Sequence, residues 1–208
     1  MRGQLSRAGR KVGTAVRLLG TDPRRFARAV RPILFRYIVF SARAEDIAPA
    51  PARDGVEIRL VTRADLSGLE QPSVDLRDAV ERCEHLLGSW AYGAFCRGEL
   101  AHLSFLIPAE RDGDRRPRLL RLEPGEAEIA SCVTLAGFRG QGLYPYMIRH
   151  LVRLAGASGH PEVFMITERR NVASQQGILK AGFTRRAGHL YRLRFLRTDI
   201  VFRPFRRA

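Results

Sequence analysis

The most informative part of the sequence is the stretch Glu128-Ile-Ala-Ser-Cys-Val-Thr-Leu-Ala-Gly-Phe-Arg-Gly-Gln-Gly-Leu-Tyr144. Its first half is rich in β-branched residues and predicts a strand over residues 128–135. The glycines that follow predict a tight turn, and a helix is expected from Gly142 to Ala155. Backbone N–H groups are free at the start of a helix and bind anions, and glycine lets a phosphate come close. The stretch therefore predicts a phosphate-binding turn. It is neither a Walker loop, since no Gly-Lys-Ser/Thr follows, nor a full dinucleotide fingerprint.

The flanking sequence predicts further strands and helices around this turn. Downstream we expect a strand over 162–167, a helix over 171–180 and a last strand or hairpin within 183–202. Upstream we expect a strand over 56–60, a helix over 64–88, a hairpin of strands 90–96 and 100–107, and a loop over 108–125. Alternation of strands with helices predicts an α/β or α+β domain built on a mixed sheet.

Two motifs resemble those of the Gcn5-related N-acetyltransferase (GNAT) superfamily. The family's pyrophosphate motif reads Gln/Arg-x-x-Gly-x-Gly/Ala, and Arg139-Gly140-Gln141-Gly142-Leu143-Tyr144 matches it at the first four positions. Tyr144 departs from the family's small residue. The second motif is an Asn-x-x-Ser helix that ends in Gly-Phe, and Asn171, Ser174 and Gly182-Phe183 have the family's spacing. The motifs span about 55 residues. The order of elements extends the resemblance to residues 56–200.

This resemblance implies a GNAT-type mixed, mostly antiparallel sheet flanked by helices, with acetyl-CoA or another acyl-CoA as co-substrate and no metal. By resemblance, the backbone from Val133 to Leu135 pairs with the pantetheine arm, and amides from Gly140 to Tyr144 hold the pyrophosphate. Asn171 and Ser174 would face the cofactor. Asn171 could also be a plain helix cap, and Gly182 a plain C-cap.

The implied activity is transfer of an acyl group from CoA to a primary amine. Aminolysis of a thioester needs a general base, and Glu128 is the first candidate, with Glu126 as a substitute. Many family members carry a tyrosine acid seven residues after the motif asparagine, where this chain has Ile178. We select Tyr191 to replace it, with His189 and Tyr144 as alternatives. Cys132 is read as a small buried hydrophobe rather than a nucleophile. The acceptor is left open among amino sugars, small amines and protein amino groups.

The net charge of +15 lies at the two ends of the chain. Residues 1–50 carry eleven basic and three acidic residues, and residues 184–208 carry eight basic residues and Asp199, whereas residues 51–183 are neutral. We expect a basic N-terminal extension over 1–50 and a GNAT domain over 56–202, joined by a Pro- and Ala-rich linker.

Within that extension, an amphipathic helix is expected to start at Asp22 and Pro23 and to run through Ile38. It could lie on an anionic membrane surface or pack on the domain. The alternative function is therefore a catalytically degenerate CoA-binding fold, or a basic module that binds membrane or nucleic acid. No nucleic-acid motif is evident, which makes nucleic acid the weaker partner. The three cysteines have no CxxC spacing, and no apolar run is long enough to span a bilayer, so we expect a cytoplasmic protein. It would be peripheral to the membrane if the amphipathic helix lies on an anionic surface.

Overall fold

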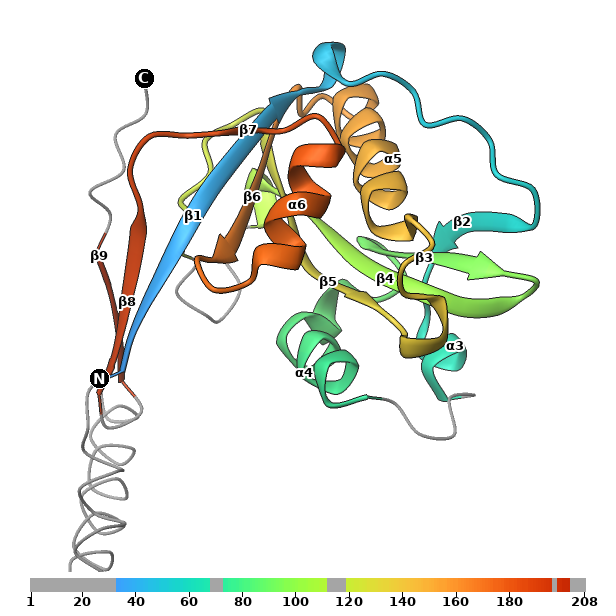
Figure 1. Cartoon of the computed structure of the whole chain (residues 1–208), viewed down its shortest axis with the longest axis horizontal. Helices are drawn as coiled ribbons and strands as arrows, with labels where there is room; N and C mark the ends of the chain where they lie inside the picture. The colour runs from blue at the N-terminus through green and yellow to red at the C-terminus, as the bar shows by residue number, and fades with distance from the viewer. Residues whose placement is uncertain (1–32, 68–72, 112–118, 196–197, 203–208) are drawn as a thin grey trace, which may run out of the picture.

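The computed structural model describes residues 33–67, 73–111, 119–195 and 198–202. Nine strands in this part form one mixed sheet, in the order β2-β3-β4-β5-β6-β1-β8-β9, with β7 paired to β1 (Figure 1). Every strand pair is antiparallel except β5 with β6. With its flanking helices this is the expected GNAT-type architecture.

The strands are β1 (Ile33–Arg43), β2 (Val56–Leu60), β3 (Ala91–Cys96), β4 (Glu99–Pro108), β5 (Glu126–Thr134), β6 (Glu162–Glu168), β7 (Thr184–Arg185), β8 (Leu190–Phe195) and β9 (Thr198–Phe202). The α-helices are α3 (Arg63–Ser67), α4 (Val74–Cys83), α5 (Leu143–Ala157) and α6 (Val172–Lys180). Short 3-10 turns are η1 (Ala44–Asp46), η2 (Glu84–Leu86), η3 (Ala109–Arg111) and η4 (Ala136–Phe138).

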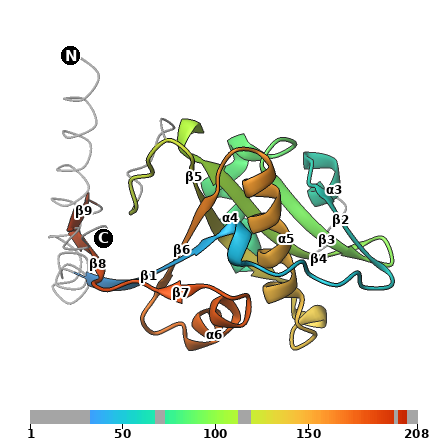
Figure 2. The same cartoon turned by 90° about the horizontal axis from the view of Figure 1, so that it is seen from above.

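The helices cover opposite faces of the sheet. Helix α5 brings Met147, Ile148 and Leu151 against one face, and α6 adds Ile178 to the same buried cluster. Helix α4 packs Leu76 and its neighbours against the other face. Figure 2 shows α5 and α6 on one side of the strands, with β8 and β9 reaching beyond α6. Ile129 on β5 belongs to the α5 side and Val133 to the α4 side, although residues four apart on a regular strand share a face. A bulge between these residues shifts the alternation by one.

The predicted amphipathic helix is wrong over residues 33–38, which form the first half of strand β1. This strand lies inside the sheet, with β6 on one side and β7 and β8 on the other. Tyr37, Ile38, Val39 and Phe40 are all buried, because their alternate side chains enter cores on both faces. A run that is apolar at every position does not distinguish a helix from a fully buried strand.

The sheet therefore begins at Ile33 and not after the linker at residue 56. The start of the predicted helix, and the rest of residues 1–32, lie outside the described residues. The helix expected over 64–88 is also divided into α3, α4 and η2. In the described part of the chain, no helix is long and apolar enough to cross a bilayer.

Candidate active site

Strands β5 and β6 separate after three paired residues. The parallel ladder joins Glu126–Glu128 to Glu162–Phe164 and then stops, although β5 continues to Thr134 and β6 to Glu168. On its other side β5 carries a bulge, because the register with β4 shifts between Leu103 and Phe105. Ser131 lies in this bulge with φ of 50°, in the left-handed region. A bulge bends its strand and re-aims side chains, and strained residues of this kind gather at functional sites.

A cavity of about 750 Å³ opens where the two strands part. The bulge and end of β5, the end of β6, helix α4, the first turn of α6 and the turn before α5 all contribute to its wall. The residues that line it are Tyr37, Asp75, Asp78, Ser131, Cys132, Val133, Thr134, Arg139, Tyr144, Ile166, Thr167, Glu168, Asn171, Ala173 and Ser174. The cavity thus brings together five residues predicted for the cofactor from the two separate motifs: Val133, Arg139, Tyr144, Asn171 and Ser174.

The predicted turn leads directly into α5. Gly140 and Gly142 have φ of 78° and 72°, a conformation that strains other residues. Gly142 is the N-cap, and no side chain caps the helix. Pro145 has no N–H, so the amides of Leu143 and Tyr144 are the donors at the start of α5. The helix start expected at Gly142 is confirmed, and its backbone donors are of the kind that hold an anion.

Two arginines flank this turn. Arg139 donates from Nε to the carbonyl of Thr134 at 3.1 Å and lies 3.8 Å from the Asp75 carboxylate. Arg53 comes from the linker and donates from Nη2 to the carbonyl of Gln141 at 2.8 Å. Its guanidinium lies 5.4 Å from the ring centre of Tyr146. The predictions did not include Arg53, because no local sequence pattern links a linker arginine to a turn 88 residues later.

Tyr144 fills the space that the family motif gives to a small residue. Its ring lies against Gly177, where an added Cβ would come within 2.4 Å of Tyr144 Cδ1. The hydroxyl of Tyr144 lies 3.0 Å from the Ser174 hydroxyl. Burial raises the pKa of Tyr144, and the neighbouring Cys132 contributes in the same direction. Tyr144 is therefore a neutral phenol at physiological pH and places a proton donor at the cavity wall.

The motif asparagine caps its own helix. Asn171 Oδ1 accepts from the backbone N–H of Ser174 at 3.0 Å, as an N-cap does. Asn171 and Ser174 nevertheless both line the cavity. The capping interpretation and the cofactor interpretation are thus compatible in this structure.

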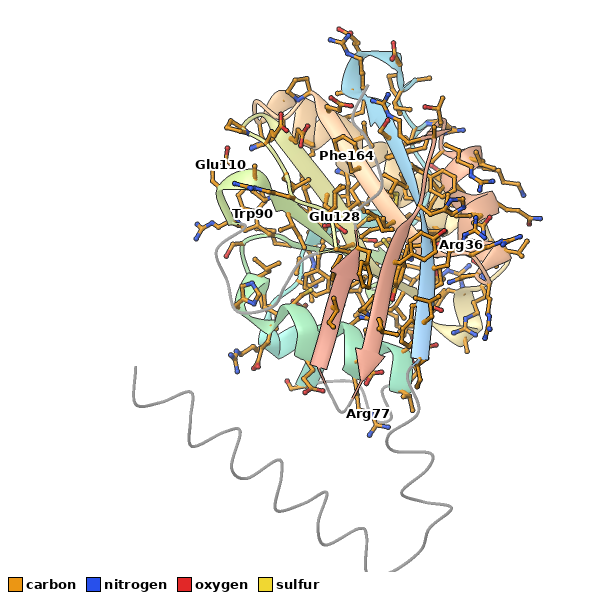
Figure 3. The ribbon with its side chains drawn as sticks, turned by 90° about the vertical axis from the view of Figure 1, so that its left-hand side faces the viewer. Arg36, Arg77, Trp90, Glu110, Glu128 and Phe164 are labelled. Carbon is orange, nitrogen blue, oxygen red and sulfur yellow. The ribbon has the colours of Figure 1, made fainter. Side chains whose placement is uncertain are left out.

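Glu128 is buried at the last paired position before the strands separate. It pairs with Ile107 on β4 and Phe164 on β6, and only 6% of it is exposed. Figure 3 shows Glu128 and Phe164 in the interior of the molecule. Glu128 does not line the cavity itself, but it precedes Ser131 and Cys132, which do. The alternative base, Glu126, accepts from the backbone N–H of Glu123 at 2.7 Å and so holds a turn.

The predicted acid Tyr191 is not among the residues that line the cavity. It pairs with Arg36 on β1 and lies beside His189, with 6.3 Å between the ring centres. His189 in turn lies between Arg36 and Arg185. The structure brings Tyr144 to the cavity and leaves these two candidates elsewhere.

Two further side chains near the cavity, Cys132 and His102, are uncharged at neutral pH. Burial raises the pKa of the Cys132 thiol to about 12, so the thiol carries its proton at neutral pH. Burial lowers the pKa of His102 to about 3. His102 is neutral between Thr134 and Ser104, at 2.7 Å from each hydroxyl. In the described ranges, no group of three or more His, Cys, Asp or Glu side chains could hold a metal ion.

No family model matches this sequence, and no curated protein matches it. Solved structures with a similar fold include the following three proteins. A GNAT-family acetyltransferase from Colwellia psychrerythraea has a TM-score of 0.53 and 16% identity over 83% of this chain and 60% of that chain. A GCN5-related N-acetyltransferase from Sphaerobacter thermophilus has a TM-score of 0.53 and 15% identity over 85% of this chain and 56% of that chain. A functionally unknown conserved protein from Staphylococcus epidermidis has a TM-score of 0.54 and 14% identity over 80% of this chain and 64% of that chain.

These likenesses establish a GNAT-type fold. The chain spans less than two thirds of the length of the structures it matches.

Proposed function

We propose that this protein is an N-acyltransferase that moves an acetyl or other acyl group from acyl-CoA to a primary amine. The observation that carries the proposal is the cavity between β5 and β6, whose wall includes Arg139 and Tyr144 on either side of the glycine turn before α5. A thioester with a long diphosphate-bearing arm needs both features, a slot for the arm and donors for the phosphates. Similarity to GNAT-fold acetyltransferases supports the same reading.

In this proposal the cofactor's diphosphate lies against the turn from Gly140 to Tyr144. The backbone amides donate to it, and Arg139 and Arg53 supply charge from two sides. Guanidinium groups suit this role because they remain charged and present several donors in a plane. The pantetheine arm runs along Val133 to Leu135, and the thioester reaches the opening near Ser131.

Two side chains, Glu128 and Tyr144, take part in the chemistry. The neutral amine attacks the thioester carbonyl, and Glu128 takes its proton, directly or through a water molecule. When the tetrahedral intermediate collapses, the C–S bond breaks and the electron pair goes to sulfur. Tyr144, which is hydrogen-bonded to Ser174, then donates its proton to the thiolate. The proton that Glu128 took returns to Tyr144 through solvent, which restores both groups. Tyr144 replaces Tyr191 as our proposed acid, because Tyr144 alone of the two lines the cavity.

A second candidate is a fold that binds acyl-CoA without turnover. The position of the usual family tyrosine is Ile178, which is fully buried in the core and has no acid function. An amine-library screen with detection of the released thiol separates the two candidates. Release that depends on a primary amine supports transfer. Tight acyl-CoA binding with no release across amino sugars, small amines and peptides would favour the second candidate.

The proton donor has its own test. Tyr144→Phe keeps the ring against Gly177 and removes only the hydroxyl. We expect turnover to fall by about 10²-fold, the lower end of the range for positioned acids and bases, with acyl-CoA affinity preserved. Tyr191→Phe is the matched control, and an equal loss in both variants would remove Tyr144 from the mechanism.

A further inference from the structure

One face of the β1–β8–β9 ribbon carries apolar side chains that no described helix covers. Register puts Leu34 opposite Leu193, and Leu193 opposite Ile200; Arg36, Tyr191 and Phe202 form the next such row. Directly opposed residues of antiparallel strands share a face. We call this set the ribbon face: Leu34, Arg36, Tyr191, Leu193, Ile200 and Phe202.

The ribbon face is continuous with the sheet surface that α6 covers further along β1. Ile38 and Phe40 lie on the same face of β1 as Arg36, and they are buried in one cluster with Ile178 of α6. Toward the start of the strand the cover ends. Leu34 is 59% exposed, Ile200 47% and Phe202 49%. Figure 3 shows β1, β8 and β9 in the foreground of the view, beside α6.

Cationic side chains border this apolar surface. Arg36 Nη2 lies 3.3 Å from His189 Nδ1, and Arg185 Nη2 lies 3.4 Å from His189 Nε2. Burial lowers the pKa of His189, and the charges of Arg36, Arg185 and Arg169 lower it further. A neutral imidazole accepts at only one nitrogen, so it satisfies only one of the two arginines. The cluster therefore has donors and positive charge to offer an anion.

Both basic ends of the chain join the sheet at this ribbon. Residues 1–32, with nine basic side chains against Asp22, lead into β1, and residues 203–208, with three arginines, follow β9. The sequence that continues from the apolar surface at either end is therefore strongly basic. A second copy of the chain would have to bring two such charged regions together. An anionic lipid surface accepts apolar side chains at its acyl boundary and arginines at its phosphates.

We propose that the ribbon face docks the protein on an anionic lipid surface. Leu34, Ile200 and Phe202 enter the headgroup layer, and the Arg36–His189–Arg185 cluster contacts lipid phosphates. This docking does not depend on the transferase proposal, because no residue of the ribbon face lines the cavity.

Co-sedimentation of the full-length protein with vesicles tests the proposal. Vesicles of phosphatidylglycerol and phosphatidylcholine in equal parts should bind the protein, and vesicles of phosphatidylcholine alone should bind it far less. Arg185→Gln should lower the partition coefficient about five-fold, the effect of one basic residue near the surface. The charge control is Arg43→Gln, which removes an exposed arginine paired with Glu45.

Ile200→Ser with Phe202→Ser tests the apolar contribution on an edge strand, where exposed positions tolerate polar residues. Its control is Leu179→Ser on α6, an apolar side chain that is 51% exposed. We expect a loss of at least ten-fold for the double variant and little change for the control. Equal vesicle binding by wild type and the ribbon variants would overturn the proposal and leave docking to the chain ends alone. A different result would assign the face to a second copy of the chain. In that case wild type would be a dimer in sedimentation equilibrium and would not bind vesicles, and the double variant would be a monomer.

Discussion

The contact between Tyr144 and Gly177 predicts that Gly177→Ala changes the free energy of unfolding in opposite directions with and without the Tyr144 ring. An alanine Cβ at position 177 would lie 2.4 Å from Tyr144 Cδ1 and 2.6 Å from Cε1. The ring cannot simply withdraw, because it also packs beside His102 at 5.8 Å between ring centres. Overpacking of a rigid site costs about 3 kcal/mol at the upper end of its usual range. Alanine in a helix recovers about 1 kcal/mol relative to glycine. Gly177→Ala should therefore destabilise the protein by about 2 kcal/mol.

The same substitution should stabilise a Tyr144→Ala protein, which has the small residue typical of the family motif. Without the ring, only the gain in helix propensity of about 1 kcal/mol remains. The coupling between the two positions is then about 3 kcal/mol, within the range for residues in contact. Urea unfolding of all four proteins, followed by circular dichroism, measures this cycle. In the wild-type background the melting temperature should fall by about 4–8 °C. If Gly177→Ala has the same effect in both backgrounds, Tyr144 does not occupy the space that the structure gives it.

Three further predictions follow from the cavity and the sheet. Glu128→Gln should lower turnover by about 10²–10⁴-fold with near-normal acyl-CoA affinity, and an unchanged pH–rate profile would place the base elsewhere. Iodoacetamide at neutral pH should alkylate Cys96 before Cys132, since the high pKa of Cys132 leaves almost no thiolate; mass spectrometry showing the reverse order would contradict the burial of Cys132. Deleting residues 1–32 should leave acyl-CoA binding intact, whereas deleting residues 1–45 should abolish folding because it removes β1 from the sheet; a folded, binding-competent 1–45 deletion would refute the topology.

The segment from Glu128 to Phe183 was predictable because its signals are local. A glycine-rich turn, a helix start and a capped second helix each depend on residues a few positions apart, and the structure has the strand, the turn and both helices where the sequence indicated. The hairpin of β3 and β4 was equally clear from its Arg97-Gly98 turn.

Strand β1 was missed because its partners are far away in the chain. Its neighbours β6 and β8 lie more than 100 residues downstream, and its burial on both faces removes the alternation that marks a strand. The contribution of Arg53 was missed for the same reason, since its partner Gln141 is distant. Tyr144 was recognised as a departure from the motif. Its accommodation by Gly177 could not be read from the sequence, because the two residues belong to different helices.

Titration calorimetry with acetyl-CoA measures whether this protein binds the proposed co-substrate. We expect the wild type to bind one equivalent saturably. Gly142→Val should lose that binding, because the valine side chain would stand where the phosphates approach the amides. Gly98→Val is the matched control, since Gly98 has a similar φ of 84° and open space around it in the β3–β4 turn. It should carry the same backbone strain and still bind. No binding by wild type, or equal affinities for wild type and a folded Gly142→Val protein, would contradict the assignment of the cavity to acyl-CoA.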